Sequence, residues 1–194
     1  HLAVSCPKGH YYETATLRQL KRGDRCPKCV KWKSQQLMHA MLEKIFSQFQ
    51  VIGLHGPEIT LKKAHGISGT QGGRLTYDYY IAEVIIANQH FSLAFEYDGL
   101  QHDEFVKIFH ETIEDFKYQQ ENDRKKDSLS LKHGTIVIRI GAHDSKGGCD
   151  YKTPQKMINA LFEEIKDATG IDLRGKFGNL DKKAHDYDWW IQDG

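Results

Sequence analysis

The sequence has no long hydrophobic run and almost no net charge. No apolar stretch approaches the roughly 18 residues that a membrane-spanning helix needs, so we expect no membrane partner. A signal-peptide pattern is also missing at the amino end. Hydrophobic residues make up 39% of the chain and charged residues 27%, a composition that excludes intrinsic disorder and indicates a soluble globular protein.

Cysteine is scarce, and three of the four cysteines lie near the amino end. The first follows the pattern Cys6-Pro7-Lys8-Gly9-His10, and two more form Cys26-Pro27-Lys28-Cys29. A Cys-x-x-Cys turn points two thiolates at one ion, so the set Cys6, His10, Cys26 and Cys29 predicts a structural Zn²⁺ site. A redox pair or a disulfide at Cys26 and Cys29 is the alternative. It is less favoured because the segment is too short for a core of its own.

The small net charge of +1 hides an asymmetry. Residues 1–33 hold eight basic and two acidic side chains, a net charge of +6, whereas the remaining residues have a net charge of −5. A basic head suits contact with a polyanion, although a solvated surface module would look the same. The candidate DNA-binding residues are Arg18, Lys21, Arg22, Arg25, Lys28, Lys62, Lys63 and Arg74.

The spacing of apolar residues predicts helices and strands in alternation. Ser34 is a candidate N-cap for an amphipathic helix of about 16 residues. We expect strands over 75–84, 85–97 and 135–140, and helices over 110–132 and 154–169. The glycine-rich segment 53–74 reads as a mobile loop. These elements predict an α/β (α+β) fold with a mixed sheet, organised as a zinc module (1–33), a main domain (34–170) and an irregular tail (171–194).

One acidic run is the most informative feature of the chain. The strand-like segment Leu93-Ala94-Phe95 leads into Glu96, Asp98 and, four residues later, His102. Side chains two apart on a strand point to the same face, so Glu96 and Asp98 would project together. Carboxylates that share a buried strand end repel each other unless a cation neutralises them. Mg²⁺, or Mn²⁺ in its place, is a suitable cation because it prefers carboxylate oxygens.

The chain resembles the PD-(D/E)XK nucleases, and most closely the branch with the very-short-patch repair endonuclease and the EDxHD homing endonucleases. That resemblance implies a restriction-endonuclease-like core. The predicted zinc module of this chain, residues 1–33, resembles a treble clef or zinc ribbon. The residues that carry the likeness are Tyr77-Asp78-Tyr79, Ala94-Phe95-Glu96-Tyr97-Asp98-Gly99-Leu100-Gln101-His102, Asp123-Arg124-Lys125-Lys126-Asp127 and Ile136-Val137-Ile138-Arg139-Ile140.

The resemblance also implies roles for individual residues. Asp78 would bind the catalytic metal, and Glu96 and Asp98 would complete or flank its shell. His102 would activate water, oriented by Asp123 or else Asp127, and Lys126 would meet the scissile phosphate. The family often has a glutamate in its first helix, which makes Glu43 a candidate. One departure is that Asp98 stands where a lysine is common, as in the branch that uses histidine.

These observations predict a metal-dependent DNA endonuclease that hydrolyses phosphodiester bonds, as a homing, restriction or repair-type nicking enzyme. Its partner would be duplex DNA, and double-strand cutting would need a homodimer or two sequential nicks. Two alternatives remain open: a non-catalytic DNA-binding protein on a nuclease-like fold, and an RNA nuclease. The reduced cysteines favour a cytoplasmic compartment in a bacterial or phage-infected cell, or the nucleus of a eukaryote.

Overall fold

The computed structural model describes residues 2–5, 11–15, 33–67, 75–98, 112–141 and 154–177. The chain divides into two compact units, residues 1–36 and 37–194. In the first unit, strands β1 (Leu2–Ser5) and β2 (Tyr11–Ala15) form an antiparallel pair. The predicted zinc ligands Cys6, His10, Cys26 and Cys29 lie outside the described residues. Within the described ranges, every helix is too short or too polar to cross a membrane.

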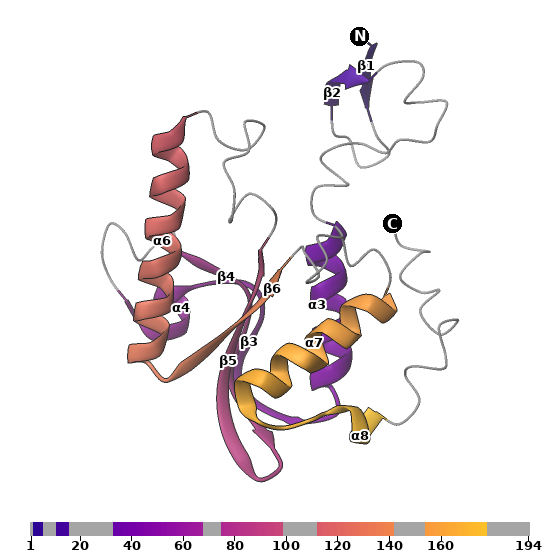
Figure 1. Cartoon of the computed structure of the whole chain (residues 1–194), viewed down its shortest axis with the longest axis vertical. Coiled ribbons are helices and arrows are strands. Elements are labelled where there is room, and N and C mark those ends of the chain that lie inside the picture. The colour runs from indigo at the N-terminus through magenta and orange to yellow at the C-terminus, as the bar shows by residue number, and fades with distance from the viewer. Residues whose placement is uncertain are drawn as a thin grey trace. The chain divides into compact units, whose positions relative to one another are not determined.

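The second unit is built around a four-stranded mixed sheet with the order β3-β4-β5-β6 (Figure 1). Its strands are β3 (Gln50–Thr60), β4 (Thr76–Ile86), β5 (Gln89–Asp98) and β6 (Thr135–Gly141). The first three are antiparallel neighbours, and β5 and β6 are parallel. Ala87 and Asn88 join β4 to β5 with positive φ angles of 50° and 62°, the backbone that a two-residue hairpin turn requires.

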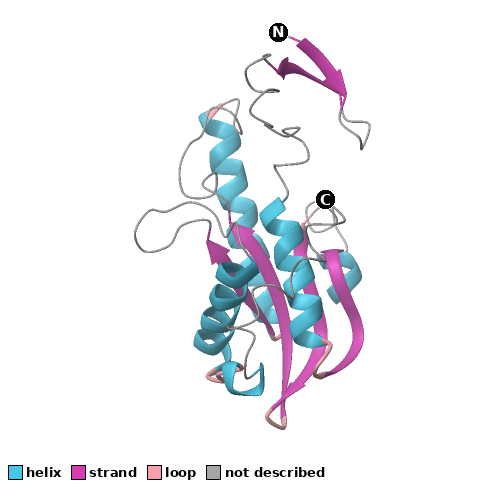
Figure 2. Cartoon of the chain, turned by 90° about the vertical axis from the view of Figure 1, so that its right-hand side faces the viewer, coloured by secondary structure: helices cyan, strands magenta, loops and turns pink. Residues whose placement is uncertain are grey.

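One face of the sheet packs against helices α3 (Lys33–Phe46) and α7 (Pro154–Thr169) (Figures 1 and 2). The core on this face is apolar and contains, among others, Met38 and Met41 of α3, Phe95 of β5 and Leu161 of α7. Apolar residues recur at helical spacing along both helices, so each one buries a continuous stripe. The short helix α8 (Arg174–Phe177) adds the ring of Phe177 to the edge of this core.

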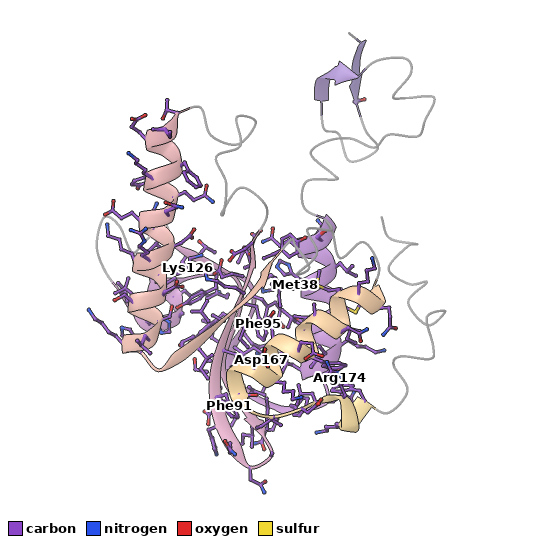
Figure 3. The ribbon with its side chains drawn as sticks, viewed as in Figure 1. Met38, Phe91, Phe95, Lys126, Asp167 and Arg174 are labelled. Carbon is purple, nitrogen blue, oxygen red and sulfur yellow. The ribbon has the colours of Figure 1, made fainter. Side chains whose placement is uncertain are left out.

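The opposite face is covered by helices α4 (Leu61–His65) and α6 (Ile113–Lys132). Among the side chains of α6 that the structure describes, the two buried ones are Lys126 and Ser130. Leu131, by contrast, is 79% exposed. Helix α6 therefore has no apolar stripe. In Figure 3, Lys126 lies between α6 and the sheet, whereas Phe95 and Met38 lie toward α3.

The mixed α/β fold predicted from the sequence is confirmed, but two segments differ from expectation. Part of the expected loop 53–74 forms β3 and α4. Gly53 and Gly56 adopt positive φ in β3, and Pro57 lies on the edge strand of the sheet, where a missing N–H is tolerated. Residues 174–177 form α8 within the tail that was expected to be irregular.

Candidate active site

Asp78 and Glu96 lie beside each other on adjacent strands, at the place where the backbone pairing of β4 with β5 ends. The antiparallel register runs as far as Tyr79 opposite Phe95, and the next positions along the two strands are Asp78 and Glu96. The Oδ2 atom of Asp78 accepts the main-chain N–H of Tyr97 at 2.8 Å. A side chain of β4 thus satisfies this amide of β5, which fixes the Asp78 carboxylate next to Glu96.

Glu96 is a buried carboxylate with one neutralising partner. It is 5% exposed, and the Lys126 ammonium donates to its Oε2 at 2.7 Å. The other oxygen, Oε1, is buried without a hydrogen-bond partner within the structure. Burial raises the pKa of Glu96 to about 7, with the neighbouring Asp78 carboxylate contributing to the rise and Lys126 opposing it. A further cation beside this carboxylate would stabilise its ionised form and lower its pKa.

Lys126 connects α6 with both of the strands that carry the acids. Besides Glu96 on β5, its ammonium donates to the main-chain carbonyl oxygen of Thr76 on β4 at 3.0 Å. The predicted role for Lys126 was contact with a phosphate, and the structure places its charge at the Glu96 carboxylate. Sequence reasoning found this residue through the family resemblance, because α6 lacks the apolar spacing that would show its buried face.

Asp98 has a different partner from Glu96. Both of its oxygens accept from one guanidinium nitrogen of Arg139, at 3.0 and 2.9 Å, and the other nitrogen donates to Asp127 at 2.7 Å. Arg139 stands opposite Glu96 in the parallel register of β5 and β6. Arg139 therefore neutralises the third carboxylate of the group. Sequence reasoning assigned no role to Arg139, although an arginine inside the β-branched run Ile136-Val137-Ile138-Arg139-Ile140 was a usable signal.

Two residues of α3 meet the segment that carries Asp78. Tyr79 donates its hydroxyl hydrogen to the Oε1 atom of Glu43 at 2.6 Å. Burial is the main cause that raises the pKa of Tyr79, and the bond to Glu43 adds to it. The half-buried ring of His39 makes a hydrogen bond to the backbone of Asp78, and burial lowers the pKa of His39. The structure thus joins Glu43 to the neighbour of Asp78, and His39 to Asp78 itself.

The remaining predicted residues fall into two groups. Asp123, on α6 three residues before Lys126, is half-buried, and Lys62 and Lys63 are exposed on α4. The other predicted residues lie outside the described ranges: His102, Arg18, Lys21, Arg22, Arg25, Lys28 and Arg74. In the part of the chain that the structure describes, no three or more His, Cys, Asp or Glu side chains are grouped so that they could hold a metal ion.

No model of a known protein family, no curated protein and no solved structure matches this chain. The arrangement of the side chains around Glu96 is therefore the basis for a functional proposal.

Proposed function

We propose that this protein is a metal-dependent DNA endonuclease with Asp78 and Glu96 at its catalytic centre. The observation that carries the proposal is the juxtaposition of these two carboxylates with the Lys126 ammonium at one end of the β4–β5 pair. Two acids on adjacent strands are what the nuclease resemblance implies. A plain structural ion pair accounts less well for a second buried carboxylate oxygen without a partner.

The donor set fits a hard divalent cation. Asp78 and Glu96 offer carboxylate oxygens, and Mg²⁺ is commonly held by one or two carboxylates while waters and substrate phosphates fill its other positions. A two-carboxylate site is therefore compatible with the absence of any larger ligand group among the described residues. When bound, Mg²⁺ or Mn²⁺ lowers the pKa of a bound water and stabilises the charge that develops on the phosphate.

The other residues have roles that follow from their contacts. The Lys126 ammonium, shared between Glu96 and the Thr76 carbonyl, would donate its remaining hydrogen to a phosphate oxygen. Arg139 pairs with Asp98 and with Asp127, which reduces the negative charge that Asp98 would add beside the scissile phosphate. His102 remains the proposed proton acceptor, oriented by Asp123.

Substrate binding would use the basic residues. Lys62 and Lys63 are exposed on α4, on the same side of the sheet as α6, and can contact a phosphodiester backbone. The proposed zinc module, with a net charge of +6 over residues 1–33, would supply most of the remaining phosphate contacts. No residue in this set is assigned to a ribose 2′-hydroxyl, the group that distinguishes RNA from DNA. The assay should therefore compare matched DNA and RNA substrates.

The test is nicking of a supercoiled plasmid with Mg²⁺ or with EDTA. We expect Mg²⁺-dependent nicking that Asp78→Asn and Glu96→Gln each reduce by about 10²-fold or more, without loss of DNA binding. The matched control is Glu83→Gln on β4, the strand of Asp78. The Glu83 carboxylate pairs with His90 at 2.6 Å and takes no part in the proposed site. Binding without Mg²⁺-dependent cutting would instead support the non-catalytic DNA-binding alternative, and cutting of RNA alone would support the RNA nuclease.

A further inference from the structure

Helix α6 packs Leu129 against the smaller apolar cluster on its side of the sheet, and it also makes a set of polar contacts that the function proposed above does not require. Lys126 contacts Glu96 and Thr76, Ser130 contacts Tyr77, and Asp127 contacts Arg139. An apolar stripe would tolerate sliding or rotation by a fraction of a turn, because hydrophobic contact has no direction. Hydrogen bonds to individual atoms do not allow this, so they determine which turn of α6 faces the acids.

The hydrogen bonds around Tyr77 are consistent with only one assignment of donors and acceptors. The Ser130 hydroxyl donates to the main-chain carbonyl oxygen of Lys126 at 2.6 Å, which uses its single hydrogen. Tyr77 must then donate to Ser130 across their 2.5 Å contact, and the Nε2–H of His65 must donate to the Tyr77 hydroxyl at 3.0 Å. The chain of donors thus starts at His65 on α4 and ends on the backbone of Lys126.

Three consecutive residues of β4 therefore surround the candidate site. The Thr76 carbonyl oxygen accepts from the Lys126 ammonium, the Tyr77 hydroxyl reaches the same turn of α6 through Ser130, and the Asp78 carboxylate accepts from β5. Tyr77 and Ser130 are both fully buried. Outside the catalytic pair itself, Tyr77 is the residue through which β4 fixes the backbone of α6 at Lys126.

We propose that Tyr77 is a positioning residue, which holds the Lys126 ammonium against Glu96 through its hydrogen bond to Ser130. This inference rests on the proposed function, because it assigns Lys126 a part in catalysis. The hydrogen bonds of the Tyr77 hydroxyl run to Ser130 and His65. Loss of its hydroxyl would leave the tyrosine ring in place but remove one of the bonds that fix the turn of α6 that carries Lys126.

The first test measures the position of Lys126 without any cleavage. In Tyr77→Phe we expect the acylation rate of the Lys126 amine, followed by mass spectrometry, to rise ~2- to 10-fold, the factor expected from loss of one hydrogen bond. Amide exchange in the last turns of α6 should accelerate by the same factor. The matched control is Tyr80→Phe, because Tyr80 stacks on Tyr77 with ring centroids 5.4 Å apart but its hydroxyl is directed toward Ser92.

Ser130→Ala removes the same bond from the helix side and should reproduce the effect if Tyr77→Phe fails to fold. The double variant should be no worse than either single variant, because both partners of the bond are then gone. Equal acylation rates in wild type, Tyr77→Phe and Ser130→Ala would overturn the proposal. Equal acceleration in Tyr80→Phe would also overturn it, because general loosening of the aromatic cluster would then be the cause.

The second test is a double-mutant cycle on cleavage. Tyr77→Phe should lower kcat ~2- to 10-fold with KM nearly unchanged in the wild-type background, and should have no further effect in Lys126→Met. Additive losses would show that Tyr77 acts independently of Lys126 and would overturn the positioning role. If the wild-type protein does not cleave at all, the proposed function fails, and the acylation assay still decides whether Tyr77 positions Lys126.

Discussion

Both faces of the sheet carry an apolar cluster, but only the smaller one, on the α4 and α6 side, lies beside buried polar contacts to a helix in the part of the chain that the structure describes. On the α3 and α7 face, side chains such as Met38, Phe95 and Leu161 form an apolar core. On the α6 face, the helix buries Lys126 against Glu96 and Ser130 against Tyr77, and its exposed Asp127 contacts Arg139. Hydrophobic burial supplies most of the stability but little direction, whereas polar contacts supply direction at a cost in desolvation. Glu96 and Lys126 lie on the α6 face, where hydrogen bonds orient the side chains.

Phe95 and Glu96 provide the sharpest comparison, because they are neighbours on β5 that face opposite sides. Phe95→Ala should destabilise the protein by about 3–5 kcal/mol, since it removes a fully buried ring from the apolar core. Urea denaturation measures this loss. The control Leu131→Ala, at a largely exposed site, should change stability by less than about 0.5 kcal/mol. A small loss in Phe95→Ala would mean that the apolar face is not the main source of stability.

Lys126→Met tests the polar face and should have the next largest effect. Removing one partner of a buried ion pair leaves an uncompensated charge, and the cost is at the low end of roughly 3–5 kcal/mol. Lys126 holds the pKa of Glu96 down, so Glu96 keeps its proton to higher pH in the variant, and the cost should grow as the pH rises above about 7 and stay nearly constant below it. Urea denaturation at both ends of this pH range measures the difference. An equal cost at low and high pH would show that Glu96 is not the group left unpaired.

The pH dependence of stability isolates Glu96 itself. Its pKa is about 7 in the folded protein against an ordinary value of 4.5, so the folded state holds a proton that the unfolded state releases between these values. Stability contributed by this group is therefore present below pH 4.5 and falls as the pH rises toward 7, by roughly 3 kcal/mol in total. The difference between the wild-type and Glu96→Gln unfolding curves should show this fall. Mg²⁺ should reduce it, because a bound cation favours the ionised carboxylate.

The sequence predicted the apolar face better than the polar one, for a physical reason. Helices α3 and α7 were recognisable because a buried apolar stripe repeats at helical spacing. The strand β3 was missed because Gly53, Gly56 and Pro57 interrupt its pattern. Local spacing carries the apolar signal, so these elements are readable without knowing what they pack against.

The candidate site was predictable only in part. The two-residue spacing predicted that Glu96 and Asp98 project to the same face, and in the structure Glu96 bonds to Lys126 of α6 while Arg139 joins Asp98 to Asp127 of the same helix. Which acid pairs with which cation depends on the register of β5 with β6 and on the placement of α6. These are non-local features, and neither leaves a pattern in the residues around position 96.

The smallest expected loss of stability is for the exposed partner of Arg139, Asp127, compared with its more buried partner, Asp98. Asp127 is 48% exposed and shares Arg139 with Asp98, so Asp127→Asn should cost less than about 1 kcal/mol, and less still at high salt. Asp98→Asn removes the more buried carboxylate, which accepts twice from Arg139, and should cost about 1–3 kcal/mol. Urea denaturation at low and high salt compares the two variants. If Asp127→Asn proved as costly as Asp98→Asn at both salt concentrations, the surface contact would itself anchor α6, and the orientation of Lys126 would depend on Arg139 more than on the bond from Tyr77 to Ser130.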